Sequence, residues 1–158
     1  MTEPKTGRPW MPGYGVPESV DGALPWSWAS ERLEKSRNYF LATTRPDGRP
    51  HLMPLWGVWM HDLFCFSTAI TSIKSKNLLA EPRCAVTIED GHNSVTVEGV
   101  ARVTPLAEVP GFIDAYTEKY GPEGAGPIGD GPIWTMKPTV AFAFNEDETF
   151  STSACEQR

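Results

Sequence analysis

The stretch that decides the fold runs from Tyr39 to Arg102 and reads YFLATTRPDGRPHLMPLWGVWMHDLFCFSTAITSIKSKNLLAEPRCAVTIEDGHNSVTVEGVAR. Short runs of β-branched and aromatic residues alternate in it with proline, glycine, aspartate and asparagine, which is typical of antiparallel strands joined by turns. In the Pro-Asp-Gly turn, proline presets one backbone dihedral and glycine accepts a positive one. We therefore predict a hairpin of strands Tyr39–Thr43 and His51–Met60, followed by strands Leu63–Ser67, Cys84–Glu89 and Ser94–Val103.

One short helix, predicted over Thr71–Ala80, interrupts these strands. Ser67 and Thr68 close the preceding strand, and Ser72 and Lys74 stand where the helix begins. Helix N-termini offer unpaired N–H groups and a partial positive charge, which favour anions. Lysines in a first turn oppose the helix dipole, and a bound phosphate would reverse that small local cost. The cluster predicts a phosphate site. On spacing alone, a capped surface helix with solvated lysines is the alternative.

Composition divides the chain into three parts: an arm (1–25), a barrel domain (26–145) and a polar tail (146–158). The arm is rich in proline and glycine, so it is expected to form neither a helix nor a central strand. It is either a disordered leader or a segment whose Trp10 and Tyr14 pack against the body or a second subunit. Within the domain we also expect helices over Pro25–Ser36 and Leu106–Tyr120, a long loop over Gly121–Pro132 that would suit a mobile lid, and final strands over Ile133–Met136 and Thr139–Asn145.

Chain length, hydrophobic content and net charge predict one soluble domain. The chain has 158 residues, 40% of them hydrophobic, and a net charge of -6, which argues against nucleic acid or an anionic membrane surface as the main partner. No segment has the length of a membrane span or the h-region of a signal peptide, so the cytoplasm is the default expectation. The cysteines, Cys65, Cys84 and Cys155, contain no CxxC pair, and the first two read as small buried hydrophobes.

About six strands with two or three interrupting helices predict a mainly β fold, a small antiparallel barrel with appended helices. Both faces of His51–Met60 are apolar, so one faces a core and the other requires a subunit partner or a flat ligand. Trp56, Trp59 and Phe66 suit an isoalloxazine-like ring, although strand residues of this kind are usually core. No metal site is expected, because the three histidines show no ligand spacing.

Several motifs in register resemble the pyridoxamine 5′-phosphate oxidase-like split β-barrel proteins. The first hairpin carries Leu41-Ala42-Thr43-Thr44 and Asp47-Gly48-Arg49-Pro50-His51. The match continues through Pro54-Leu55-Trp56, Phe66-Ser67-Thr68, Ser72-Ile73-Lys74-Ser75-Lys76-Asn77-Leu78, Glu81-Pro82-Arg83 and Val97-Glu98-Gly99-Val100-Ala101. The resemblance implies a six-stranded antiparallel split barrel that is a homodimer, with a flavin in the groove between its subunits. The spacing Ser-x-Lys-x-x-Asn-Leu-Leu and the many tryptophans are most similar to the actinobacterial branch that uses the deazaflavin coenzyme F420 instead of FMN.

The resemblance also implies a set of cofactor-binding residues. Ser72 and Lys74 would bind the cofactor phosphate, and the remaining members are Met53, Pro54, Leu55 and Trp56 along the ring and ribityl chain, with Ser67, Thr68 and Asn77. One departure is the C-terminal segment Ser153–Arg158, which stands where that branch often has a basic aromatic segment. A cofactor contact from the tail is therefore not expected with the usual residues.

The implied activity is an oxidoreductase in which the reduced cofactor passes a hydride to an unsaturated or oxidised organic small molecule. An FMN enzyme, a cofactor carrier without turnover, and a haem-binding barrel with His51, His61 or His92 as ligand are the alternatives. No catalytic residue is assigned. Water, or the hydroxyl of Tyr116 or Tyr120, is considered as the proton donor.

Overall fold

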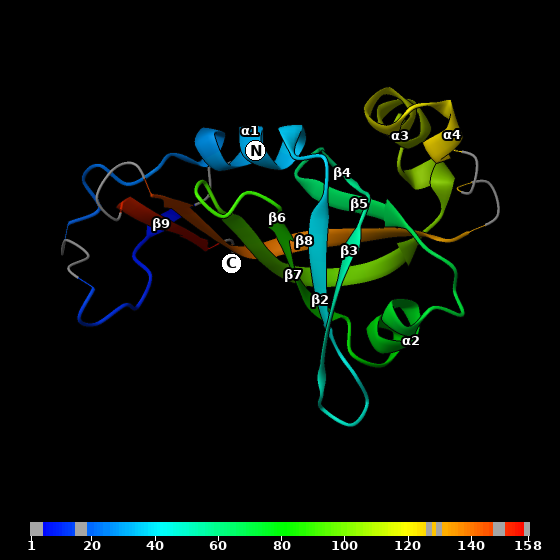
Figure 1. Ribbon diagram of the computed structural model, residues 1–158, viewed down its shortest axis with the longest axis horizontal. Helices are drawn as coiled ribbons and strands as arrows, with labels where there is room; N and C mark the ends of the chain where they lie inside the picture. The colour runs from blue at the N-terminus through cyan, green and yellow to red at the C-terminus, as the bar shows by residue number, and fades with distance from the viewer. Residues whose placement is uncertain (1–4, 15–18, 126–127, 129–130, 147–150, 157–158) are drawn as a thin grey trace.

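The computed structural model describes residues 5–14, 19–125, 128, 131–146 and 151–156. Within them, nine strands form one antiparallel sheet with helices at its margins (Figure 1). The strands are β1 (Lys5–Gly7), β2 (Tyr39–Thr44), β3 (Pro50–Leu55), β4 (Val58–Met60), β5 (Leu63–Ser67), β6 (Arg83–Ile88), β7 (Val95–Thr104), β8 (Ile133–Asn145) and β9 (Ser151–Glu156). The helices are α1 (Trp26–Lys35), α2 (Ile73–Ala80), α3 (Phe112–Tyr120) and α4 (Pro122–Ala125), with a 3-10 turn, η1 (Leu106–Glu108).

The sheet is organised around the long strand β8. One of its edges pairs with β7 over most of its length, and the other pairs with β5 near its start and with β9 near its end. Beyond β7 the order continues through β6 and β2 to β3, so β3 is an edge strand, where Pro54 costs no ladder bond to a further strand. In the view of Figure 1, α1, α3 and α4 lie along the upper margin of the sheet and α2 below it. The predicted mainly β, antiparallel split-barrel fold is confirmed, but the sheet has nine strands in the described residues rather than the six expected.

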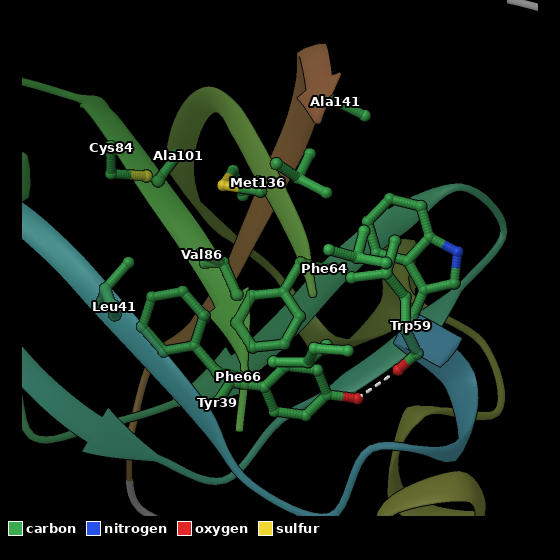
Figure 2. Close-up of a cluster of buried hydrophobic side chains, with 14 of the residues drawn as sticks. Tyr39, Leu41, Trp59, Phe64, Phe66, Cys84, Val86, Ala101, Met136 and Ala141 are labelled. Carbon is green, nitrogen blue, oxygen red and sulfur yellow. Dashed lines mark hydrogen bonds between the residues drawn. The ribbon is translucent and has the colours of Figure 1, made fainter. Parts of the chain in front are cut away.

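The main core fills the concave face of this sheet. Alternate residues of β2, β6 and β7 are buried, as expected for strands with one face covered. Figure 2 shows the aromatic centre of this core, in which the ring of Tyr39 lies 4.7 Å from that of Phe64. The Tyr39 hydroxyl donates a hydrogen bond to the carbonyl oxygen of Leu33, so α1 is attached to the core by both apolar packing and a polar contact.

A smaller cluster lies beneath α3. Phe112, Tyr116 and Tyr120 recur at helical spacing and are buried together against Val58 and Cys65. Burial raises the pKa of the Cys65 thiol to about 12, and Cys84, in the main core, is raised to about 12 by the same cause. The prediction that these two cysteines are buried hydrophobes is confirmed.

The prediction of one strand over His51–Met60 is wrong. β3 ends at Leu55 and pairs with β2, whereas β4 begins at Val58 and pairs with β5. The chain changes partners at Gly57, where an added Cβ would overlap the Phe64 ring. Residues on both predicted faces stay apolar through Gly57, so the sequence pattern did not reveal the change of partner strand.

Three other elements differ from the prediction. The helix predicted over Leu106–Tyr120 is divided into η1 and α3, because Gly111 takes a φ of 82° at the N-cap of α3 and breaks the continuous helix. The last two strands are a single strand, β8, which follows an irregular register opposite Gly99. The predicted loop Gly121–Pro132 contains α4, and its residues 126–127 and 129–130 lie outside the described part.

The arm and the tail also take part in the sheet. β1 pairs with β9, and β9 pairs in turn with β8, so segments from both ends of the chain extend one side of the sheet. β1 is an edge strand, which agrees with the prediction that the arm forms no central strand, whereas β9 was not predicted from the polar tail. No helix in the described ranges is long and apolar enough to cross a membrane.

Candidate functional site

The connection from β5 to α2 positions the strongest candidate site. Ser72 is the N-cap of α2, in an extended conformation (φ -65°, ψ 155°), and its Oγ accepts a hydrogen bond from the Ser75 N–H at 3.2 Å. Serine is favoured at this position because its side chain satisfies an N–H group that the helix leaves unpaired. The predicted capped helix is confirmed, with its first residue at Ile73 rather than Thr71.

Hydroxyl groups form a chain behind this cap. Thr68 Oγ1 donates to Ser72 Oγ at 3.3 Å, Ser72 Oγ contacts Ser75 Oγ at 3.2 Å, and Ser75 Oγ donates to the Ala69 carbonyl oxygen at 2.9 Å. Ser75 is completely buried, so the half-buried Ser72 hydroxyl is held from the interior. Ser67 is not part of this chain, because its hydroxyl donates to the Pro132 carbonyl oxygen at 3.3 Å.

The first turn of α2 keeps donors available for an anion. In the described part of the chain, the backbone N–H groups of Ile73 and Lys74 make no hydrogen bond, while the next two N–H groups are bonded to Ser72. Lys74, a half-buried residue of the first turn, adds a full positive charge to this end of the helix. Two free amides and an ammonium at a helix start fit the charge and donor pattern of a phosphate group.

Asn77 ties α2 to the first hairpin. It is 2% exposed, and its Nδ2 donates to Thr43 Oγ1 at 2.9 Å. Thr43 Oγ1 lies in turn 3.3 Å from His51 Nδ1. Asn77 was predicted as a site residue from the sequence, whereas Thr43 and Ser75 were not. For Thr43, the missed signal was its inward position in the alternation of β2.

The predicted ring-binding residues on and directly after β3 differ in the contacts of their side chains. Met53 and Pro54 are exposed, whereas Leu55 is buried in the main core. Trp56 stacks on Tyr120 with ring centroids 4.7 Å apart and planes at 8°, and its Nε1 donates to Asn38 Oδ1 at 3.1 Å. The side chains of Leu55 and Trp56 therefore make contacts within this protein, and a cofactor role for the four residues stays a prediction.

The two tyrosines considered as proton donors lie on α3, where both are buried and the Tyr120 hydroxyl is hydrogen-bonded. The Tyr120 oxygen accepts the Gly57 N–H at 3.0 Å and lies 2.8 Å from the Gly57 carbonyl oxygen and 2.7 Å from that of Arg37. Burial raises the pKa of Tyr120 to about 12, and burial also raises that of Tyr116. The Tyr120 hydroxyl is therefore a structural link rather than a source of protons.

The convex face of the sheet exposes several apolar side chains among polar ones. The register places Leu52 beside Ala42, Ala42 beside Ala85, and Ala85 beside Glu98, so these side chains form one row across four strands. Leu52 is 58% exposed, and the same face carries Val100 at 44% and Phe142 at 38%. A cavity of about 450 Å³ opens on it, and Arg83 and Glu98 are its charged lining residues among those described.

In the described residues, no group of three or more histidine, cysteine, aspartate or glutamate side chains is placed to hold a metal ion. The observed features, a curled antiparallel half-barrel with a serine-capped, lysine-bearing helix at the end of a core strand, define the class of split β-barrel proteins. Residues 29–144 match the family model described as "Pyridoxamine 5'-phosphate oxidase". The chain belongs to this family, whose members bind flavin or haem.

Solved structures agree with this fold. The conserved hypothetical protein Rv2991 from Mycobacterium tuberculosis superposes with a TM-score of 0.70 at 23% identity, covering 83% of this chain and 91% of that one. An F420 reductase gives a TM-score of 0.58 at 24% identity, covering 80% and 98%. A heme binding protein from Mycobacterium smegmatis gives 0.68 at 16% identity, covering 85% and 59%. A comparison with curated protein sequences finds no match.

Proposed function

We propose that this protein is an oxidoreductase that binds coenzyme F420 and transfers a hydride between it and an unsaturated or oxidised organic small molecule. The observation that carries the proposal is the start of α2, where a capped helix end and two free amides share the first turn with Lys74. An F420 reductase among the similar structures supports F420, and FMN, which also carries a phosphate group, is the alternative cofactor.

The residues present fit a phosphate-bearing flavin or deazaflavin. Ser72 and Lys74 would hold the phosphate, Thr68 would orient the Ser72 hydroxyl, and the exposed Met53 on β3 would offer an apolar contact to the ring. The bound cofactor supplies the hydride chemistry, and the protein supplies orientation and shielding from water. No described side chain is assigned as proton donor, because the Tyr120 hydroxyl is used by the fold and Tyr116 is buried in the cluster beneath α3.

The proposal includes a homodimer formed through the convex face. This face extends from β3 across β2 and β6 to β8 and exposes large apolar side chains, an arrangement that a monomer rarely keeps in water. A second copy of the chain would cover it with the same residues, as in an isologous interface. A cofactor at the edge strand β3 would then lie close to the partner subunit.

Absorbance and fluorescence of the purified protein provide the first test, followed by titration of the apo protein with F420, FMN and haem. F420 binding together with turnover of the reduced coenzyme supports the proposal. Binding of FMN alone shifts the assignment to the alternative cofactor. Haem binding without either flavin contradicts it.

A substitution tests the phosphate site directly. Lys74→Ala should weaken binding of F420 or FMN by about 1–3 kcal/mol, the scale of a charge-assisted hydrogen bond. The matched control is Lys35→Ala, which removes a lysine from the exposed face of α1. Equal affinities of wild type and Lys74→Ala would exclude Lys74 from the site.

The dimer is tested by sedimentation at micromolar concentration. Val100→Glu places a charge on the convex face and should give a monomer, whereas Ile113→Glu, on an exposed position of α3, should leave the dimer intact. A wild-type monomer at this concentration contradicts the dimer proposal.

A further inference from the structure

The Lys119 side chain joins three elements of the fold. It belongs to the last turn of α3, its Nζ lies 2.6 Å from the Tyr39 hydroxyl at the start of β2, and it donates to the Glu34 carbonyl oxygen in α1 at 3.1 Å. Tyr39 is completely buried, so the half-buried Lys119 side chain extends to the margin of the core. The proposed function makes no use of this amine.

The oxygen atoms around Lys119 Nζ suit a neutral amine better than an ammonium. An ammonium carries three N–H donors and a neutral amine carries two. In the described residues, two oxygen acceptors lie within hydrogen-bond distance of Nζ, the Tyr39 hydroxyl and the Glu34 carbonyl. The third N–H of an ammonium is left, in the same residues, with the rings of Tyr39 and Tyr120, whose centroids lie 4.7 and 5.8 Å from Nζ. The neutral amine therefore keeps both N–H groups bonded and its lone pair free.

The charged groups around Lys119 act in opposite directions. Burial and then the charge of Arg37 lower the pKa of Lys119 to about 8, whereas Glu34 in α1 and Glu89 after β6 raise it. Arg37 Nη1 donates to the Lys119 carbonyl oxygen at 3.1 Å. Burial raises the pKa of the Tyr120 phenol, which therefore adds no charge. A desolvated lysine next to another cationic group is one of the ways in which proteins make a lysine nucleophilic.

Arg37 also offers a binding group for an anionic reagent. It is exposed, forms no salt bridge in the described part of the chain, and its guanidinium carbon lies 5.5 Å from the centre of the Tyr120 ring, against which Lys119 Nζ also lies. Guanidinium groups bind phosphate oxygens through parallel N–H donors. An acyl phosphate carries a phosphate group and a reactive carbonyl carbon in one small molecule, so the two ends match Arg37 and the Lys119 amine.

We propose that Lys119 is a modification site that accepts an acyl group from an acyl phosphate, and that this modification weakens the attachment of α3 to α1. The Nζ lone pair attacks the carbonyl carbon, an N–C bond forms, and the C–O bond to phosphate breaks. Inorganic phosphate leaves with the electron pair, and the proton lost from nitrogen passes to water. The amide product has one N–H and no charge, so it keeps at most one of the hydrogen bonds to Tyr39 and Glu34.

The experiment treats the folded full chain with acetyl phosphate at pH 7.5 and measures the acetylation rate of each lysine by peptide mass spectrometry. Lys119 should react about tenfold faster than Lys35, an exposed lysine of α1, because its neutral fraction is roughly a hundredfold that of an ordinary lysine, while burial and lower basicity offset part of this gain. A rate for Lys119 equal to or below that of Lys35 overturns the proposal. The preference should disappear in urea, and its persistence there would assign it to local sequence instead of to the fold.

Arg37→Gln tests the binding group for phosphate. It should slow acetylation of Lys119 about fivefold and leave Lys35 unaffected, and with p-nitrophenyl acetate, an uncharged acyl donor, the loss should be smaller. Equal rates in this variant and the wild type overturn the role of Arg37. In the wild type, the Lys119 rate should level off above pH 8, and a continued rise to pH 10 contradicts a lysine of lowered basicity.

Hydrogen exchange tests the effect on α3. Lys119→Gln removes the charge as acylation does, and it should speed the exchange of amides in the last turn of α3 about fivefold, because the contacts to Tyr39 and Glu34 are lost. The matched control is Lys35→Gln, which should leave these amides unchanged. If both variants exchange as slowly as the wild type, the Lys119 contacts do not hold α3, and this part of the proposal fails.

Discussion

Tyr120→Phe tests the link between α3 and the β3–β4 crossing. The Tyr120 oxygen accepts the Gly57 N–H at 3.0 Å and has two carbonyl oxygens within reach, at 2.7 Å on Arg37 and 2.8 Å on Gly57. A hydroxyl has one proton, so it donates to one of these carbonyl groups at a time. Phenylalanine keeps the ring, and with it the stack on Trp56, so the substitution removes the polar contacts alone.

The expected loss of stability follows from the polar groups that Tyr120→Phe leaves without a partner. Gly57 is buried, so its N–H loses its partner without gaining water, which costs about 1–3 kcal/mol, and loss of the donated hydrogen bond adds about 1 kcal/mol. We expect the free energy of unfolding to fall by about 3 kcal/mol. For a domain of this length, that corresponds to a fall in Tm of roughly 6–12 °C.

Urea unfolding followed by circular dichroism measures this difference, provided that the m-value is the same in both proteins. The control is Tyr14→Phe, which removes the hydroxyl of a tyrosine that is 61% exposed and should change stability by less than about 0.5 kcal/mol. If Tyr120→Phe is as stable as this control, the Gly57 N–H has another partner and the reasoning is refuted.

Three further predictions concern other parts of the fold. Cys65 and Cys84, whose pKa values burial raises to about 12, should react with a thiol reagent at neutral pH only after denaturation, and rapid reaction of either thiol in the native protein would contradict their placement. Gly99→Ala should destabilise the protein by about 3 kcal/mol in urea unfolding, because its Cβ overlaps the Lys137 carbonyl oxygen, whereas Gly91→Ala, which meets open space, should be nearly neutral. Burial and the charge of Arg37 lower the pKa of Lys119 to about 8 from its ordinary value of 10.5, so between these values the unfolded chain binds more protons and the free energy of unfolding should rise with pH. That rise, measured relative to Lys119→Met at pH 8 and 10, should be absent if Lys119 stays charged throughout.

Most of the barrel could be predicted because its strands obey a local rule. In β2, β6 and β7 buried residues alternate with more exposed ones, and turn residues separate the strands. Each strand can therefore be predicted from its own segment of sequence. The start of α2 was predictable for the same reason, because an N-cap serine acts within three residues. These features depend on neighbours in sequence.

The missed features depend on contacts between distant segments. The crossing at Gly57 is enforced by the Phe64 ring, and β9 exists through its pairing with β8 and with β1. The links from Asn77 to Thr43 and from Trp56 to Tyr120 join residues 34 and 64 positions apart. No periodicity within one segment encodes such pairs, because partner choice is decided when the sheet closes.

The two ends of the half-barrel differ in how their polar groups are satisfied. Near α3, the Lys119 ammonium donates to the Tyr39 hydroxyl at 2.6 Å and to the Glu34 carbonyl oxygen at 3.1 Å, and the Tyr120 hydroxyl is also fully bonded. Near α2, the Thr43, Ser75 and Asn77 side chains are bonded inside, yet the outward cations and first-turn amides have no partner in the described residues.

This difference indicates that the two ends of the half-barrel have different roles. Lys119, half-buried at one end, is hydrogen-bonded to two oxygen atoms, whereas Lys74 and Lys76 at the other end have no aspartate or glutamate at exposed positions such as Ile73 or Leu79. Apolar residues stand there instead, and they neither neutralise the lysines nor contribute to the core. The α2 end therefore keeps its positive charge available to an external anion, whereas the α3 end holds the chain together.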